Sequence, residues 1–345
     1  MYESYYGLTG KAFRLNPDPE FYFDSQGHAS AYSYLKYGVF QSEGFMVITG
    51  EIGAGKTTLV RALLRALDPT QVVSAQVVST QLEADDLLRT AAIAFGLLAQ
   101  GMDKAQLLAT LEAYFTQLAL EGRRALLVVD EAQNLSPHAM EELRMLSNFQ
   151  IDEQGLLQSF LIGQPELRDL LRLPSLRQLR QRIIASYHLG PMTESETRGY
   201  IEHRLKRVGY AGDPRIEVAA FRAFHETTGG IPRRINLLAN RVLLAAYLAE
   251  KHDIGAADVY QAAREVGEEI GPEIVSAPQV PSNLLPSGLA QTSVGAPRAD
   301  ALAHINARLE RLENGISEVL EQLRLSQESS SLMGPGTKTG RRFPQ

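Results

Sequence analysis

Short runs of consecutive apolar residues alternate with longer helix-compatible stretches over the first part of the chain. Four such runs stand out: residues 45–48, 72–78, 126–129 and 160–162. Strands that are apolar on both faces are typical of a parallel sheet, because helices cover such a sheet above and below. The pattern therefore predicts an α/β domain over residues 1–190, with helices on both faces of a parallel sheet.

The pattern becomes purely helical after residue 190. Three stretches carry apolar residues at every third or fourth position: 197–208, 218–227 and 235–248. Thr193 and Glu196 have the spacing of a capping box, which starts a helix. These features predict a separate all-helical domain over residues 191–270.

The last part of the chain changes character again. Residues 271–300 combine five prolines with serine and glycine, and predict a linker that cannot hold a core. Apolar residues then recur at spacings of three and four: Leu302, Ile305, Leu309, Leu312, Ile316, Val319 and Leu323. This heptad pattern predicts a coiled-coil helix over residues 301–325, which we favour over a single helix docked on the globular part. Residues 326–345 are predicted to be a disordered tail.

Composition and charge narrow the function. A chain of 345 residues with 44% hydrophobic residues is too apolar to be wholly disordered and can form two domains. A net charge of −6 lacks the basic footprint of a bulk DNA-binding protein. The absence of cysteine excludes disulfides, thiolate metal sites and cysteine nucleophiles. Neither a signal peptide nor an apolar window of about 18–20 residues is found, so we expect a cytoplasmic protein without a membrane span.

Residues 50–57 match the complete phosphate-loop pattern GxxxxGK[ST]. A strand-like run precedes the loop and a helix-compatible run follows it, which is the context that phosphate binding requires. We expect backbone N–H groups to bind the phosphates of ATP, Lys56 to approach the β/γ-phosphates, and Thr57 to coordinate Mg²⁺. The nucleotide-binding set in this segment is Gly50, Glu51, Ile52, Gly53, Ala54, Gly55, Lys56, Thr57 and Thr58.

Two carboxylates follow the apolar run at 125–129, as in a Walker B motif. Asp130 is expected at the carboxyl end of a buried strand, where it can hold Mg²⁺ through water. Glu131 points elsewhere and can orient and deprotonate the attacking water. An ordinary strand-to-loop transition is the alternative, but the complete phosphate loop favours hydrolysis. The seven histidines are scattered, so Mg²⁺ that arrives with the nucleotide is the one metal predicted.

Further motifs resemble AAA+ ATPases of the ExeA type, the general secretion pathway protein A family. These are Ala132-Gln133-Asn134-Leu135, Gly163-Gln164-Pro165-Glu166-Leu167 and Gly229-Gly230-Ile231-Pro232-Arg233-Arg234-Ile235-Asn236, and residues 6–22 resemble the family's opening. The resemblance covers residues 1–270 and implies a P-loop AAA+ fold with a helical lid. ExeA-type proteins generally continue into a membrane span and a periplasmic domain. This chain instead looks most like secretion ATPases encoded with exosortase (PEP-CTERM) and polysaccharide export systems.

The resemblance also implies roles for single side chains. Gln164 matches sensor 1, a polar residue at the end of the strand beside Walker B. Arg233 matches sensor 2, which reaches the γ-phosphate from the lid, with Arg234 as the fallback. An arginine finger precedes the last strand of the base domain, where we favour Arg182 over Arg180.

The implied nucleotide site includes a pocket for adenine. Adenine is expected between residues 22–28 and the lid near residues 231–232. His28 is either an adenine contact or a structural residue, and the sequence leaves both readings open.

A finger acts across a subunit interface, so the resemblance implies a homo-oligomer, of which a hexameric ring is one form. The leading hypothesis is a cytoplasmic AAA+ ATPase that drives assembly or remodelling in an envelope secretion or polysaccharide export system, held at the inner membrane by partner proteins. The alternative is a DNA-associated ATPase of the transposition-regulator or initiator type. A local arginine cluster at residues 168–182 favours it, whereas the negative net charge opposes it. A nucleotide-gated scaffold that hydrolyses ATP poorly is the third reading, and Glu131 and Arg233 argue against it.

Overall fold

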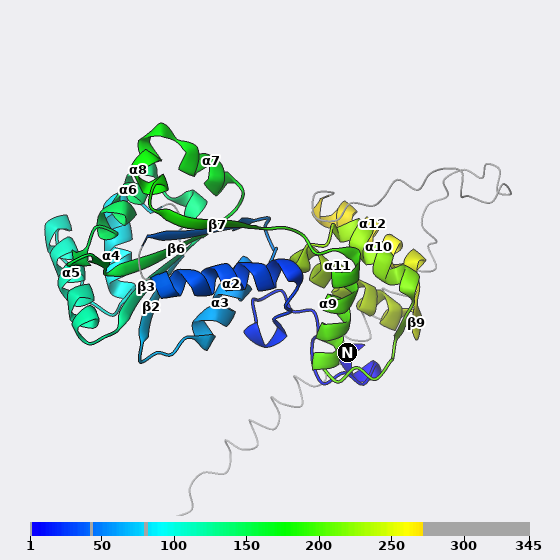
Figure 1. The fold of residues 1–345 in the computed structure, drawn as a ribbon. Coiled ribbons are helices and arrows are strands. Elements are labelled where there is room, and N and C mark those ends of the chain that lie inside the picture. Colours follow the sequence, from blue (N-terminus) through cyan, green and yellow to red (C-terminus); the bar gives the residue numbers. More distant parts are fainter. Residues whose placement is uncertain (1, 42–43, 79–81, 272–345) are drawn as a thin grey trace, which may run out of the picture. The chain divides into compact units, whose positions relative to one another are not determined.

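The structure is a computed structural model, and it describes residues 2–41, 44–78 and 82–271 (Figure 1). The predicted linker (apart from Gly271), coiled coil and tail lie outside the described residues. In the part of the chain that is described, no helix combines the length and the apolarity needed to cross a membrane.

A five-stranded parallel sheet organises the first domain. Its strand order is β2-β3-β6-β1-β7, and every neighbouring pair is parallel. The strands are β1 (Phe45–Gly50), β2 (Val72–Val78), β3 (Arg124–Asp130), β6 (Leu157–Gly163) and β7 (Ile183–Leu189). The four predicted strands are confirmed. The edge strand β7 carries mixed exposed and half-buried positions, so it produces no continuous apolar run.

Each face of the sheet has its own hydrophobic core, because alternate residues of a strand point to opposite faces. Met46 and Ile48 of β1 pack with the helices α2 (Gln26–Gln41) and α3 (Lys56–Ala66). Phe45 and Val47 belong to the core of the other face. The helices of that face are α4 (Ala84–Ala94), α5 (Lys104–Leu120), α6 (Pro137–Leu146), α7 (Glu166–Arg172) and α8 (Arg177–Arg180). Figure 1 shows these two layers, and the predicted fold class is confirmed.

Short elements complete this domain. The two-residue strands β4 (Gln150–Ile151) and β5 (Gln154–Gly155) form a small antiparallel hairpin before β6. Single 3-10 turns occur at η1 (Pro19–Phe21), η2 (Ala132–Asn134) and η3 (Pro174–Leu176). The turn η2 directly follows the two predicted carboxylates, Asp130 and Glu131, and sets the direction of the chain after them.

The second domain is a helical lid. It contains α9 (Glu194–Arg207), α10 (Val218–Thr228), α11 (Pro232–Leu248) and α12 (Ala256–Ile270). The capping box of Thr193 and Glu196 begins α9 as predicted. The strands β8 (Arg215–Ile216) and β9 (Asp253–Ile254) pair in parallel within the lid, where the sequence predicted none. Two-residue strands are too short to give an alternating pattern that sequence reasoning could detect.

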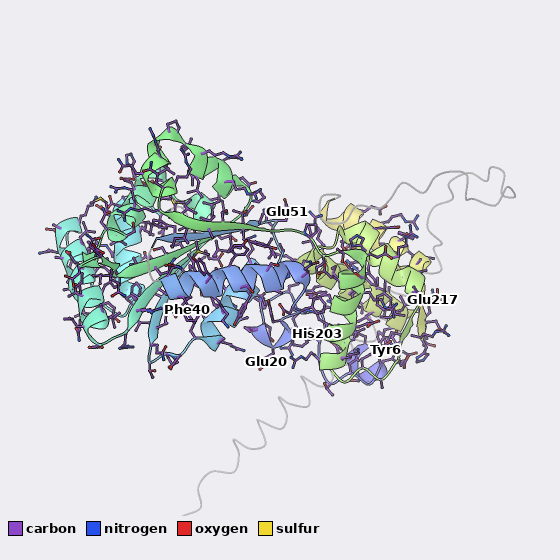
Figure 2. All side chains as sticks on the ribbon, in the orientation of Figure 1. Tyr6, Glu20, Phe40, Glu51, His203 and Glu217 are labelled. Atoms are coloured by element: carbon purple, nitrogen blue, oxygen red, sulfur yellow. The ribbon has the colours of Figure 1, made fainter. Side chains whose placement is uncertain are left out.

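The N-terminal segment, residues 2–21, contributes buried side chains to the core of the lid. The helix α1 (Tyr2–Tyr5) contacts α11, and the buried side chains of this segment join the lid core: Tyr2, Tyr6, Leu8, Ala12, Phe13 and Phe21. Figure 2 shows Tyr6 among the lid side chains. The core of the lid therefore includes residues that the predicted boundary at 190 assigned to the first domain. Aromatic residues in a turn-rich segment carry no periodicity that reveals their packing partner.

A buried polar network fastens this N-terminal segment to the lid. The Arg204 guanidinium donates to the carbonyl oxygens of Ala12 at 2.8 Å and Arg14 at 3.3 Å. Asn236 accepts a hydrogen bond from the Tyr200 hydroxyl at 2.9 Å and donates to the Arg14 carbonyl at 3.4 Å. Since buried polar groups need partners, these side chains specify where residues 12–14 lie. The last residue of the 229–236 motif thus has a structural role.

Candidate active site

The phosphate loop joins β1 to α3 and has the conformation its glycines allow. Gly53 and Gly55 have φ angles of +83° and +100°, a region that glycine adopts with little strain. A Cβ on Gly53 would lie 2.3 Å from the Cβ of Arg233, and one on Gly55 would lie 2.7 Å from Nε2 of His28. Both the backbone shape and the close neighbours therefore require glycine at these positions.

Lys56, the first residue of α3, is buried, and its side chain reaches back to the start of the phosphate loop. Its Nζ donates to the carbonyl oxygens of Gly50 at 2.7 Å and Glu51 at 2.9 Å. Burial lowers the pKa of Lys56, and the carboxylates of Glu131 and Asp130 oppose that shift. A phosphate group would offer stronger, charged acceptors to the same ammonium. The lysine therefore lies where it can exchange loop carbonyls for phosphate oxygens.

Thr57 and Asp130 form an oxygen pair beside the loop. The Thr57 hydroxyl donates to Oδ2 of Asp130 at 2.9 Å, and the N–H of Glu131 donates to Oδ1 at 3.0 Å. Burial raises the pKa of Asp130, while these two hydrogen bonds oppose the shift. Hydroxyl and carboxylate oxygens are the ligands that Mg²⁺ prefers, and a cation would favour the charged carboxylate. These residues therefore fit a Mg²⁺ ion.

Glu131 leaves the strand direction directly after Asp130. Its φ angle of +54° is left-handed, and its half-buried carboxylate turns toward the end of β6. Oε2 accepts hydrogen bonds from Nε2 of Gln133 at 2.7 Å and from Nε2 of Gln164 at 3.2 Å. The structure thus brings together Glu131 and Gln164. Sequence reasoning gave Gln133 no role, although it stands in one of the quoted motifs.

The start of the lid helix α11 contacts the phosphate loop. The N–H of Arg233 donates to the carbonyl oxygen of Gly53 at 3.1 Å, and the Arg233 side chain is exposed there. The neighbouring Arg234 is half-buried. The structure therefore places the backbone of Arg233, at the start of α11, against the phosphate loop.

The two predicted finger arginines have partners inside their own subunit. Arg182 is half-buried and donates to the carbonyl oxygen and hydroxyl of Ser147, at 2.6 and 2.9 Å. Arg180 is exposed and donates to the carbonyl oxygen of Leu171 at 2.9 Å. Arg182 precedes β7, whereas the phosphate loop follows the parallel strand β1. Six strand residues, or about 20 Å, separate these two ends, so Arg182 lies far from the phosphate loop of its own chain.

His28 is buried against the phosphate loop. Its Nε2 lies 3.1 Å from the carbonyl oxygen of Ala54, and its Nδ1 lies 2.7 Å from the hydroxyl of Ser25. A carbonyl oxygen can only accept, so the neutral ring carries its proton on Nε2 and accepts from Ser25. Both ring nitrogens are therefore occupied by protein groups. This arrangement supports the structural reading of His28 over a nitrogen contact with adenine.

The burial of His28 gives a testable dependence of stability on pH. Burial lowers the pKa of His28, against the opposing effects of the Ala54 carbonyl and nearby carboxylates. The unfolded chain therefore binds a proton near pH 6.5, its usual pKa, while the folded chain does not. The free energy of unfolding should fall as the pH drops through about 6.5 and stop falling below the folded-state pKa. Urea unfolding at several pH values measures this decrease.

The matched variant for this prediction is His28→Gln, which removes the titrating ring. As the pH is lowered from about 7.5 to below 6.5, the unfolding free energy of this variant should fall by less than that of the unmodified protein. His188 and His203 also have pKa values lowered by burial, but they are present in both proteins and cancel in the comparison. Equal pH dependence of both proteins would contradict a buried neutral His28.

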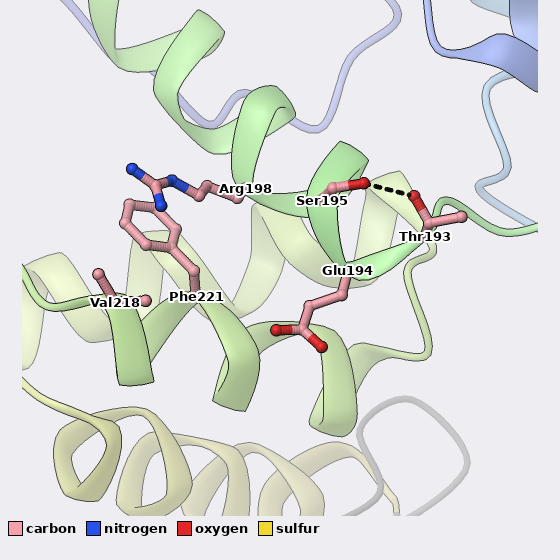
Figure 3. Close-up of a pocket in the computed structure, with 6 residues that line it drawn as sticks. All are labelled: Thr193, Glu194, Ser195, Arg198, Val218 and Phe221. Carbon is pink, nitrogen blue, oxygen red and sulfur yellow. Dashed lines mark hydrogen bonds between the residues drawn. The ribbon is translucent and has the colours of Figure 1, made fainter.

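A separate hollow lies on the lid, between the start of α9 and α10 (Figure 3). Its volume is about 460 Å³, and it is lined by Thr193, Glu194, Ser195, Arg198, Val218 and Phe221. The Arg198 guanidinium lies 5.3 Å from the centre of the Phe221 ring. The lining includes no residue of the phosphate loop, so this hollow is distinct from the predicted nucleotide site.

The fold and the site together define the class. A phosphate loop between β1 and α3, a carboxylate pair at the end of β3, a polar residue at the end of β6 and a helical lid are the parts of an AAA+ P-loop ATPase domain. In agreement, residues 40–171 match the family model of an AAA domain.

A curated protein is similar to most of the chain. The chain is 40% identical over 275 residues to General secretion pathway protein A of Aeromonas hydrophila. The match covers 77% of this chain and 48% of the relative, so the chain spans about half of that protein's length. This similarity agrees with the resemblance to the general secretion pathway protein A family that the motifs indicated.

Solved structures share the fold at low sequence identity. Cdc6p of Pyrobaculum aerophilum gives a TM-score of 0.59 at 16% identity, over 75% of this chain and 72% of that one. The ADP form of the Aeropyrum pernix ORC2 protein gives a TM-score of 0.54 at 17% identity, over 71% and 69% of the two chains. At these identities the likeness concerns the fold alone.

Proposed function

We propose that this protein binds ATP with Mg²⁺ and hydrolyses ATP to ADP and phosphate, in order to drive assembly or remodelling in an envelope secretion system. The observation that carries the proposal is the convergence of three groups at the carboxyl ends of parallel strands. These groups are the buried Lys56, the Thr57–Asp130 oxygen pair and the half-buried Glu131. Together they can hold a triphosphate and activate a water molecule beside it.

Each residue has a defined task in the proposed reaction. The N–H groups of the loop and Lys56 bind the phosphates, and Thr57 and Asp130 would hold Mg²⁺. The bound ion supplies charge neutralisation at the β/γ-phosphates. Glu131 accepts a proton from the water that attacks the γ-phosphorus, and the bond to the bridging oxygen of ADP breaks. Arg233 compensates the charge that develops on the γ-phosphoryl oxygens.

The adenine base is proposed to bind between residues 22–28 and the start of α11. The chain passes from the lid to α2 in this segment, and the Tyr22 ring lies edge-to-face on His28 with centroids 6.1 Å apart. Ile231 is buried at the start of α11. An aromatic and aliphatic lining of this kind suits the flat faces of a purine.

The ATPase is proposed to serve a secretion system of the cell envelope. The name of the curated relative supports a secretion machine and partner proteins in the cell envelope. The heptad pattern after residue 300 supports self-association, which would raise the local concentration of subunits. The proposal extends to exosortase and polysaccharide export systems on the resemblance of the sequence alone, with the protein held at the inner membrane by its partners.

The proposed function is tested by the ATPase rate as a function of protein concentration, with and without double-stranded DNA at a fixed salt concentration. We expect Mg²⁺-dependent phosphate release whose rate per subunit rises with concentration and does not respond to DNA. Stimulation by DNA would favour the DNA-associated alternative. A lack of ATP hydrolysis at all concentrations would contradict the proposal.

The arginine finger is proposed to act between subunits. To act on a neighbouring subunit, Arg180 would give up one hydrogen bond, to the carbonyl oxygen of Leu171. Arg182 would give up two, to the carbonyl oxygen and the hydroxyl of Ser147. Alanine at the finger position should reduce turnover by about 1000-fold and preserve nucleotide affinity. Mixing such a variant with Glu131→Gln subunits should restore part of the activity, which phosphate release measures.

Comparing the stability and the turnover of Arg182→Ala and Arg180→Ala distinguishes an arginine finger from an arginine that only stabilises the fold. Arg182→Ala loses a half-buried charged donor, so its unfolding free energy should fall by about 1.5–3 kcal/mol whichever arginine is the finger. Arg180→Ala loses one hydrogen bond of an exposed side chain, so its unfolding free energy should fall by about 1 kcal/mol or less. If neither variant loses turnover, the proposed finger in this segment is wrong.

A further inference from the structure

Gln133 occupies a central position between the two polar groups of the proposed site. It lies in the 3-10 turn η2, directly after the left-handed Glu131, and this turn folds its side chain back toward β3. Its Nε2 donates to Oε2 of Glu131 at 2.7 Å. A glutamate in a left-handed conformation is uncommon, so the surrounding contacts must hold the bend in place.

The other end of the same amide reaches the neighbouring strand. Oε1 of Gln133 accepts a hydrogen bond from the backbone N–H of Gln164 at 3.0 Å, at the end of β6. A Cβ on the preceding residue, Gly163, would lie 2.8 Å from this oxygen. The end of β6 thus leaves room for the Gln133 carbonyl group, and one side chain bridges the ends of β3 and β6.

The bridge has a consequence for the carboxylate. Within the described residues, both amide donors reach Oε2 of Glu131, and none reaches Oε1. Two donors on one oxygen fix the rotation of the carboxylate group and leave the lone pairs of Oε1 for a proton acceptor role. Gln133 therefore holds both the carboxylate of Glu131 and the backbone N–H of Gln164.

We propose that Gln133 is a positioning residue for ATP hydrolysis: it holds Glu131 and Gln164 as one unit and aims Oε1 of Glu131 at the attacking water. This inference rests on the proposed function of the site. Gln133 acts through Glu131 and is not itself a catalytic residue. Its loss should therefore affect the rate of hydrolysis and leave nucleotide binding intact.

The test compares Gln133→Ala and Gln133→Glu in the full chain. A hydrogen bond to a charged group corresponds to about 10- to 100-fold in rate, so both variants should lose kcat by that factor. KM and the Kd for ATP, measured by titration in Mg²⁺ buffer, should change by less than about 2-fold. The glutamate variant keeps the size of the side chain, but its ionised carboxylate cannot donate and repels the carboxylate of Glu131, so normal turnover in this variant would exclude the donor role. Gln117→Ala removes a comparable Gln–Glu hydrogen bond on the exposed face of α5 and serves as the control.

A double-mutant cycle with Glu131→Gln completes the test. If Gln133 acts through Glu131, Gln133→Ala should cause no further loss of turnover in the Glu131→Gln background. Normal kcat in both Gln133 variants, a fully additive cycle, or a parallel loss of affinity and thermal stability would overturn the inference while leaving the proposed function standing. An unmodified protein that hydrolyses no ATP would instead overturn both.

Discussion

Glu131→Gln is expected to bind ATP and to lose at least about 100-fold of its turnover, because an amide cannot accept the proton of the attacking water. The substitution keeps the size of the side chain, so the phosphate loop and the Thr57–Asp130 pair should be undisturbed. Phosphate release at saturating ATP measures the loss. Titration with ATP under the same conditions measures the retained affinity.

The control for this result is Glu153→Gln, which changes an exposed glutamate in the turn between β4 and β5. It should keep both affinity and turnover, since that turn lies outside the proposed site. Full turnover by Glu131→Gln would remove Glu131 as the general base. A loss of ATP affinity together with turnover would mean that the carboxylate supports binding, which is a different role.

Sequence reasoning could place the local parts of the site. The phosphate loop and the Asp130–Glu131 pair are contiguous segments, and strand, turn and helix geometry determine where their atoms lie. Gln164 was found through the resemblance to AAA+ ATPases, which implies a polar residue at the end of the strand beside Walker B. The structure brings these side chains together because the carboxyl ends of parallel strands meet at one edge of the sheet.

The missed features depend on contacts between distant segments. Gln133 looks like an ordinary helix or loop residue in the sequence, and its bridging role appears only when η2 is placed beside the end of β6. Arg182 looked available because its partner, Ser147, lies 35 positions earlier in the chain. No periodicity predicts such pairs, since each depends on how two elements pack.

The N-terminal segment is a further example of this limit. Its aromatic residues pack under lid helices that come about 190 residues later in the chain. Buried hydrogen bonds from Arg204 and Asn236 fix the position of residues 12–14. A hydrophobic pattern can show that a segment is buried, but it does not show against which element. Here the hydrogen bonds of buried polar groups determine the position.

Lys56→Ala is expected to lose nucleotide binding. The variant removes a charged donor whose hydrogen bonds to phosphate are worth about 1.5–3 kcal/mol, so the Kd for ATP should rise by about 10- to 150-fold. ATP at 100 times its Kd stabilises a protein by about 2.7 kcal/mol, and about half or more of this gain should vanish in the variant at the same ATP concentration. Thermal unfolding with and without ATP and Mg²⁺ measures it, with the exposed Lys206→Ala as control. An undiminished ATP-dependent stabilisation of Lys56→Ala would place the triphosphate away from the loop, and hydrolysis by Glu131 would then have no bound substrate beside it.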